Sequence, residues 1–177
     1  KNETNNQYLQ RSINDLKKKI KIIGSQRIFA FLGEPIMGQL QGDIPPLKNY
    51  WKEIRKLCTK NNIHLIMDEI YTGTGICGHY NCFSWDNFEP DFLLLGKTLS
   101  AGYVPLSAVL HNSEIEKLIK SKSGRVSFST THQGHSLGVA SALAVQNIII
   151  NQKKTLHAYD LGNYFIKNLS DELKPVD

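Results

Sequence analysis

Two charged residues, Asp68 and Lys97, each follow a short, mostly apolar run, and their types and spacing suggest chemistry. The run 64–67 ends at Asp68, and the run 92–95 leads through Gly96 to Lys97. Short apolar runs bounded by turn residues are typical of buried strands in a parallel sheet. Ligands of open α/β sheets bind beyond the carboxyl ends of such strands. The sequence therefore predicts one carboxylate and one amine at the same sheet edge.

An amine and a carboxylate in this arrangement suit a cofactor that needs both groups. Burial at the end of an apolar strand would disfavour the cationic form of Lys97 and make it a nucleophile able to form a Schiff base. Pyridoxal 5′-phosphate requires such a lysine, together with an acid that keeps its pyridine nitrogen protonated, a role open to Asp68. Taken singly, each residue also fits a plain role. Lys97 could extend its head into solvent, and Asp68 could cap a helix or pair with a local cation.

The composition is that of a globular protein with a single core. The chain has 177 residues, of which 41% are hydrophobic and 21% charged, which excludes the disordered class. No apolar stretch reaches the length of a membrane span, and the first residues lack the apolar centre of a signal peptide. The net charge is +5, but the basic residues are scattered without a recognition-helix pattern. We therefore expect a cytoplasmic protein with no membrane or nucleic-acid partner.

Three cysteines, Cys58, Cys77 and Cys82, are present. An odd and sparse count argues against a disulfide framework and fits a reducing compartment. Cys77 and Cys82 flank His79, but no second Cys/His pair with ligand spacing follows, so no metal site is expected. The sequence favours reduced thiols in a loop.

The elements that must position Asp68 and Lys97 follow from hydrophobic spacing and turn residues. Helices are expected near 9–23, 47–60, 113–119, 135–148 and 156–173, and strands near 27–32, 64–67, 92–96 and 106–110. Pro46 or its neighbour is expected to open the second helix, and Ser113 to cap the third. This order predicts an α/β fold with a mostly parallel sheet flanked by helices.

Four ordered motifs resemble the class III aminotransferases of the pyridoxal-phosphate family. They are Glu-Pro-Ile-Met-Gly at 34–38, Asp-Glu-Ile-Tyr-Thr-Gly at 68–73, Pro-Asp-Phe at 90–92 leading to Gly-Lys at 96–97, and Thr131 followed by Gly-His at 134–135. The resemblance is strongest over 25–150. It implies part of the large domain of the aspartate-aminotransferase-like fold, with residues 1–177 as one segment. The N-terminal part with its glycine/serine phosphate loop, and the C-terminal small domain, are expected to be absent.

The resemblance assigns roles to four residues around the cofactor ring. Lys97 would be the Schiff-base lysine and then the proton shuttle between the substrate Cα and the cofactor C4′. Asp68 would pair with the pyridine nitrogen, and Ile70 would pack against one face of the ring. Tyr71 stands where many members carry glutamine near the phenolic oxygen of the cofactor.

Two further residues are assigned by the resemblance to the edges of the site. Thr131 would bind the cofactor phosphate of the partner subunit across a homodimer interface. Glu34, in the family's Glu-Pro turn, would organise the site rather than react.

The sequence departs from the family pattern in the loop after Gly73, where Ile76 replaces the usual arginine and Cys77 follows.

The expected function is a transaminase that moves an amino group between an amino donor and a keto-acid acceptor through a Lys97 aldimine. A truncated, non-catalytic fragment or structural half that needs a partner chain is the alternative. Another pyridoxal-phosphate reaction on the same scaffold, such as that of an aminomutase or a decarboxylase, also stays open. A nucleotide-binding module is disfavoured because no Gly-x-Gly-x-x-Gly follows the first strand.

Overall fold

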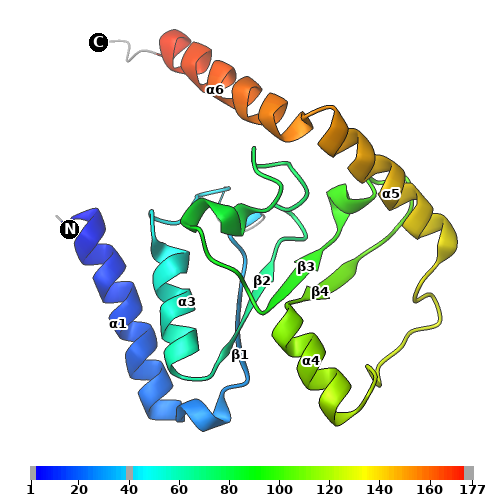
Figure 1. The fold of residues 1–177 in the computed structure, drawn as a ribbon. Helices are drawn as coiled ribbons and strands as arrows, with labels where there is room; N and C mark the ends of the chain where they lie inside the picture. The colour runs from blue at the N-terminus through cyan, green and yellow to red at the C-terminus, as the bar shows by residue number, and fades with distance from the viewer. Residues whose placement is uncertain (1–2, 39–41, 174–177) are drawn as a thin grey trace.

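A four-stranded sheet forms the centre of the molecule (Figure 1). The computed structural model describes residues 3–38 and 42–173. The strands, in spatial order, are β1 (Ala30–Gly33), β2 (His64–Asp68), β3 (Phe92–Leu95) and β4 (Ala108–His111). The pairs β1–β2 and β2–β3 are parallel, and β3–β4 is antiparallel. The predicted α/β fold with a mostly parallel sheet is confirmed.

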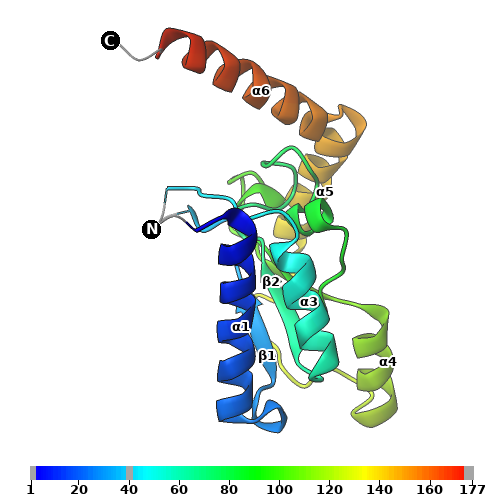
Figure 2. The ribbon, with the colours of Figure 1, turned by 90° about the vertical axis from the view of Figure 1, so that its left-hand side faces the viewer.

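Five helices surround or extend from this sheet. They are α1 (Asn5–Ile23), α3 (Tyr50–Lys60), α4 (Ser113–Lys122), α5 (Ser136–Asn151) and α6 (Lys154–Glu172) among the described residues. Short 3₁₀ turns lie at η1 (Ser25–Arg27), η2 (Cys82–Asp86) and η3 (Lys97–Leu99). Helices α1 and α3 lie side by side on one face of the sheet, and α6 extends away from it (Figures 1 and 2).

The core lies between the sheet and the pair α1 and α3. Successive strand residues point to opposite faces, and the alternate positions Leu65, Met67, Leu93 and Leu95 are buried. On the other face, within the described residues, Leu32 is exposed. Ile66, Phe92 and Leu94 on this face are half-buried, so the described part of the chain covers it less completely than the face of α1 and α3.

Three predicted element starts differ from the structure by three or four residues. Helix α1 begins at Asn5 rather than near residue 9, because Thr4 caps it. The first strand begins at Ala30 rather than residue 27, because the chain turns at Gly24 (φ 87°) into η1 before extending. Helix α3 begins at Tyr50 rather than near Pro46. Its start is set by Asp86 of η2, whose carboxylate accepts hydrogen bonds from the backbone N–H groups of Asn49 and Trp51 at 2.9 and 3.0 Å.

The cap of α4 also differs from the prediction. Asn112, not Ser113, is the N-cap residue, and its side-chain oxygen accepts a hydrogen bond from the Ile115 N–H at 3.0 Å. The predicted start of α5 near His135 is confirmed, since the His135 ring nitrogen Nδ1 accepts a hydrogen bond from the Gly138 N–H at 3.1 Å. Over residues 3–38 and 42–173, no helix is both long and apolar enough to cross a membrane.

Candidate active site

A cavity of about 210 Å³ lies beyond the carboxyl ends of β1, β2 and β3. Its lining residues are Glu34, Met37, Gly38, Asp68, Ile70, Tyr71 and Lys97. Five of the six predicted site residues therefore meet in one place. The prediction that Asp68 and Lys97 share a sheet edge is confirmed by this cavity, which is where open α/β sheets bind ligands.

Asp68 is the last residue of β2, and its carboxylate is held by its own turn. Oδ1 accepts a hydrogen bond from the Ile70 N–H at 3.0 Å. In register, Asp68 lies opposite Leu94 of β3, and the Glu69 N–H donates to the Leu94 carbonyl at 3.0 Å. The Asx-type bond fixes the direction of the carboxylate at the strand end.

Lys97 opens the η3 turn with a backbone conformation that is unusual for a residue with a side chain. Its φ is 43°, in the left-handed region. Such a conformation costs on the order of 1–3 kcal/mol and clusters at functional sites, where the surrounding structure maintains it. Here the Gln146 side chain of α5 holds the turn, donating from Nε2 to the carbonyls of Thr98 and Leu99 at 3.2 and 2.9 Å.

The exposure of Lys97 corrects one part of the sequence argument. We expected burial to make its amine nucleophilic, but the side chain is exposed in the described structure. Gly96 is closely packed, because a Cβ there would lie 3.1 Å from Cγ2 of Ile70. The strand end is thus tightly packed although the lysine head is open to solvent.

Tyr71 forms a wall of the cavity beside the lysine. The Lys97 Nζ lies 5.3 Å from the centroid of the Tyr71 ring, within the range of a cation–π contact. The negative charge of Asp43, and the hydrogen bond it accepts from the Tyr71 hydroxyl, raise the pKa of Tyr71. The ring also covers Gly38, where a Cβ would lie only 2.7 Å from Cε1 of Tyr71. Any side chain at Gly38 would displace this ring.

Glu69 is a structural residue of the site that the sequence analysis missed. Its side chain is buried and accepts hydrogen bonds from the N–H groups of Cys82 and Phe83, both at 2.9 Å, and from Nδ2 of Asn81 at 3.2 Å. Burial raises the pKa of this carboxyl, against the lowering effect of the three donors. The period of two along β2 places residue 69 on the inner face with Met67, which could have identified it.

The other two predicted site residues occupy loops. Glu34, directly after β1, is exposed at the cavity rim. Thr131 is exposed in the connection between α4 and α5 and does not line the cavity. The role of Thr131 at a partner subunit therefore stays a prediction.

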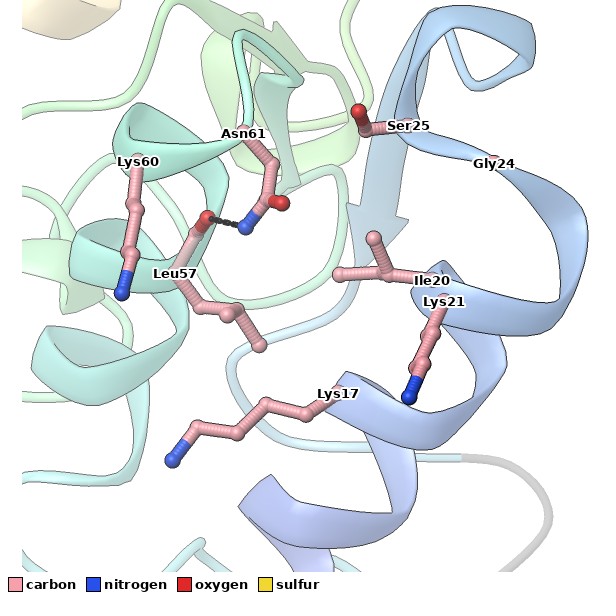
Figure 3. A pocket seen from close by; sticks show the side chains of 8 residues that line it. All are labelled: Lys17, Ile20, Lys21, Gly24, Ser25, Leu57, Lys60 and Asn61. Carbon is pink, nitrogen blue, oxygen red and sulfur yellow. Dashed lines mark hydrogen bonds between the residues drawn. The ribbon is translucent and has the colours of Figure 1, made fainter.

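A second cavity, of about 360 Å³, lies at the opposite edge of the sheet, where α1 and α3 end (Figure 3). Lys17, Lys21 and Lys60 surround it, over a floor of Ile20 and Leu57. Lys21 and Lys60 lie in the last turns of α1 and α3, where positive side chains favour the helix dipole, which accounts for these two lysines without a ligand. The cavity contains none of the predicted site residues. Within the described part of the chain, no group of three or more His, Cys, Asp or Glu side chains could hold a metal ion.

Comparison with known proteins identifies the family. The model of the family "Aminotransferase class-III" matches residues 1–177. The chain belongs to the class III aminotransferases. It is similar to an ornithine aminotransferase of Plasmodium yoelii yoelii, with 35% identity over 168 residues, which are 95% of this chain and 39% of the relative. The chain thus spans about two fifths of the length of that relative.

Solved structures show the same fold. A thermostable (S)-enantioselective omega-transaminase from Thermomicrobium roseum superposes with a TM-score of 0.89 and 31% identity, covering 97% of this chain and 38% of that one. An amine transaminase from an uncultivated Pseudomonas species, in its PLP-bound form, gives a TM-score of 0.87 and 32% identity, with 93% and 38% coverage. The open sheet and flanking helices of this class III aminotransferase chain are those of the transaminases.

Proposed function

We propose that this protein is a pyridoxal-phosphate-dependent transaminase that moves an amino group between an amine or amino acid and a keto acid. One observation carries the proposal: the Lys97 amine and the Asp68 carboxylate line the same cavity at the ends of β3 and β2. The left-handed backbone of Lys97 supports a functional role for that residue. Membership of the class III family supports the type of reaction.

The residues that line the cavity fit the ring end of pyridoxal phosphate. The group requires an amine for covalent attachment, an acid for its ring nitrogen and an apolar surface for its ring. Lys97, Asp68 and Ile70 supply these three, and they line one cavity. Tyr71, held by Asp43, would border the ring on the side of its phenolic oxygen.

When bound, the cofactor supplies a protonated pyridine ring that withdraws electrons from the substrate Cα. Asp68 would hold the proton at the ring nitrogen, and its bond to the Ile70 N–H keeps the carboxylate in position for this. The Lys97 amine would take and return the proton at the substrate Cα. Ile70 would shield one ring face from water, and Glu34 would order the rim.

The remaining parts of the site are assigned to other segments. We propose that residues 1–177 form one segment of the large domain, and that the phosphate loop and the small domain lie in further sequence, because the relatives are much longer. Thr131 would bind the cofactor phosphate of the partner subunit in a homodimer. A cytoplasmic location fits the three free cysteines of the chain.

The exposure of Lys97 favours a second candidate for the chain by itself, a non-catalytic half that requires a partner chain. Aminomutase and decarboxylase chemistry would use the same Lys97 and Asp68. Substrate contacts rather than the fold separate these reactions from transamination.

Borohydride trapping tests the assignment of Lys97. The chain is incubated with pyridoxal phosphate, reduced, digested with trypsin and examined by mass spectrometry. A pyridoxyl group on Lys97 should block cleavage there and join 61–97 to the following peptide. Lys60, which lines the other cavity, is the matched control and should stay unlabelled. Equal labelling of Lys60 and Lys97, or an adduct that persists at the same level in the Lys97→Ala variant, would contradict the assignment.

The chain's own activity is then tested with an amino donor. A transaminase that has bound the cofactor is expected to take the amino group of the donor. It should then transfer this group to a keto acid. Selective labelling of Lys97 without any transfer would favour the non-catalytic half.

A further inference from the structure

The side-chain amide of Gln146 joins helix α5 to two other segments of the chain. Its Nε2 donates to the carbonyls of Thr98 and Leu99 at 3.2 and 2.9 Å, and its Oε1 accepts a hydrogen bond from the Tyr80 hydroxyl at 2.7 Å. Because carbonyl oxygens only accept, the atom that faces them must be the nitrogen, which leaves the oxygen for Tyr80. The loop after β2, the η3 turn and α5 therefore share one half-buried side chain.

The two carbonyls that Gln146 contacts belong to the turn that begins at Lys97. This turn is a short piece of 3₁₀ helix, and the end of a helix leaves carbonyls without a partner inside it. Gln146 supplies that partner. The left-handed φ of Lys97, 43°, persists only where the surroundings maintain it. The amide thus holds the segment whose backbone sets the direction of the Lys97 side chain.

The loop after β2 holds Tyr80 beside this amide. The loop packs tightly against α6, since a Cβ at Gly78 would lie 3.0 Å from Cβ of Tyr159. Gly75 and Gly78 both have positive φ, which glycine adopts without strain. The Gly75 N–H donates to the Tyr80 carbonyl at 3.2 Å and so fixes the backbone of the tyrosine. The Tyr80 hydroxyl can therefore keep the Gln146 amide from rotating.

We propose that Gln146 is a positioning residue for Lys97, and that Tyr80 keeps its amide in the donating orientation. The inference rests on the proposed role of Lys97 as the amine that attaches the cofactor. Gln146 does not line the cavity that contains Lys97, so it acts on the lysine through the turn. Loss of the two bonds from Nε2 should free the turn and widen the range of positions that the Lys97 amine samples.

Three variants divide the contacts of the amide. Gln146→Met keeps an unbranched side chain but removes both the donor and the acceptor. Gln146→Glu keeps the acceptor for Tyr80 and replaces the donor by an oxygen that faces two carbonyls. Tyr80→Phe keeps both bonds to the turn and removes only the hydroxyl. Asn147→Met, at the next and exposed position of α5, is the matched control.

Hydrogen exchange measures the order of the turn without the cofactor. The amide N–H groups of Leu99 and Ala101 close the turn by hydrogen bonds of 2.8 and 3.3 Å to backbone carbonyls. Their exchange should be roughly tenfold faster in both Gln146 variants, the scale expected for the loss of two hydrogen bonds. Tyr80→Phe should give a smaller increase, and Asn147→Met should match the wild type.

Borohydride trapping measures the lysine itself. With limiting pyridoxal phosphate, the initial rate of labelling of Lys97 relative to that of Lys60 should fall roughly tenfold in both Gln146 variants. Tyr80→Phe should lower this ratio less. Urea denaturation of each variant identifies conditions in which it is fully folded, and labelling is carried out there so that unfolding does not contribute.

The outcomes separate this inference from the proposed function. If the wild type labels Lys60 and Lys97 equally, the proposed role of Lys97 fails and the inference fails with it. If the wild type labels Lys97 selectively and the Gln146 variants keep that selectivity, only the inference fails. Faster exchange of the turn with unchanged labelling would show a purely structural contact and would also overturn the positioning role. If the Gln146 variants do not fold, Tyr80→Phe decides, because its labelling ratio must fall below that of the wild type.

Discussion

Lys97 differs from the other lysines of the chain in what holds it rather than in how deeply it is buried. Its backbone is left-handed, as is that of Lys153, and in addition its ammonium group faces the ring of Tyr71 and its turn is held by a side chain from α5. Surface lysines such as Lys56 and Lys117 instead pair with an acid three positions before them. A lysine without such an acid, at a strained strand end, is available for covalent chemistry.

At the neighbouring strand end, Asp68→Asn should remove the negative charge of the side chain while keeping the local fold. Asparagine keeps the oxygen that accepts the Ile70 N–H bond, so the free energy of unfolding should change by less than about 1 kcal/mol. Proton removal from the substrate should slow by roughly 10²–10⁴-fold, because the ring nitrogen loses its acid. Chemical denaturation and single-turnover kinetics measure the two effects. An unchanged rate with intact stability would exclude the proposed role of Asp68.

Glu69, one position further, should behave in the opposite way. Glu69→Ala leaves three hydrogen-bond donors without their acceptor in a buried position, which should destabilise the fold by about 3 kcal/mol. Glu69→Gln keeps only one acceptor oxygen and should lose less. Urea denaturation of the three proteins tests this order. An alanine variant as stable as the wild type would mean that the loop 79–86 is not anchored by this carboxylate.

At the scale of elements, Asp91 ties helix α3 to strand β2 and to the start of α4. Its carboxylate accepts from Nη1 of Arg55 at 2.6 Å, from the Leu65 N–H at 2.7 Å and from Nδ2 of Asn112 at 3.1 Å. Burial alone would raise the pKa of Asp91, but the Leu65 N–H and the Arg55 guanidinium hold it below its ordinary value of 3.8. Helix α3, β2 and the start of α4 therefore share one negatively charged anchor.

The lowered pKa of Asp91 gives a prediction with a defined sign. A group whose pKa is lower in the folded state stabilises the fold above its unfolded value and loses this contribution as the pH falls through the folded value. Asp91→Asn should therefore cost about 2 kcal/mol at neutral pH and progressively less below pH 3.8. Denaturation midpoints across this range measure the effect. Asp15→Asn, at the exposed pair with Lys18, is the control and should change little at any pH. If Asp91→Asn lowered the free energy of unfolding by the same amount at neutral and at acid pH, the assignment would be contradicted.

The elements also show what one sequence can predict. Asp68 and Lys97 were placed correctly because the apolar runs before them are local, and strand ends of a parallel sheet share one edge. The start of α3 was missed because its cap, Asp86, is 37 positions from Asn49. The support of the lysine turn was missed because Gln146 is 47 positions from Leu99. Pairings over such distances depend on the packed structure and leave no local pattern.

At the scale of the whole molecule, α6 is the least covered of the described helices. No described residue of α6 is buried. Its exposed apolar side chains include Leu156, Tyr159, Leu161, Tyr164, Phe165, Ile166 and Leu169. Apolar surface of this extent is typical of interfaces. Because the relatives are more than twice as long, we expect further segments or a second subunit to contact this helix.

Mixing of subunits tests whether Thr131 completes the site of its partner. Homodimers of Lys97→Ala should be inactive, and homodimers of Thr131→Ala should bind the cofactor weakly. In a mixed dimer, one site would combine an intact Lys97 with an intact Thr131 from the other subunit, while the second site carries both defects. Random exchange of equal amounts should restore about a quarter of the wild-type sites, measured as transaminase activity after denaturation and joint refolding.

The geometry of the proposed homodimer decides the outcome of this experiment. If Thr131 instead served the cavity of its own subunit, every site in the mixture would carry one defect and no activity would return. The exposed position of Thr131, outside the cavity that contains Lys97, favours restoration. A mixture of wild-type and doubly substituted subunits gives the matched control. If Thr131 serves the site of its partner, both sites of each mixed dimer in this control are defective. If Thr131 serves the site of its own subunit, one site of each mixed dimer stays intact.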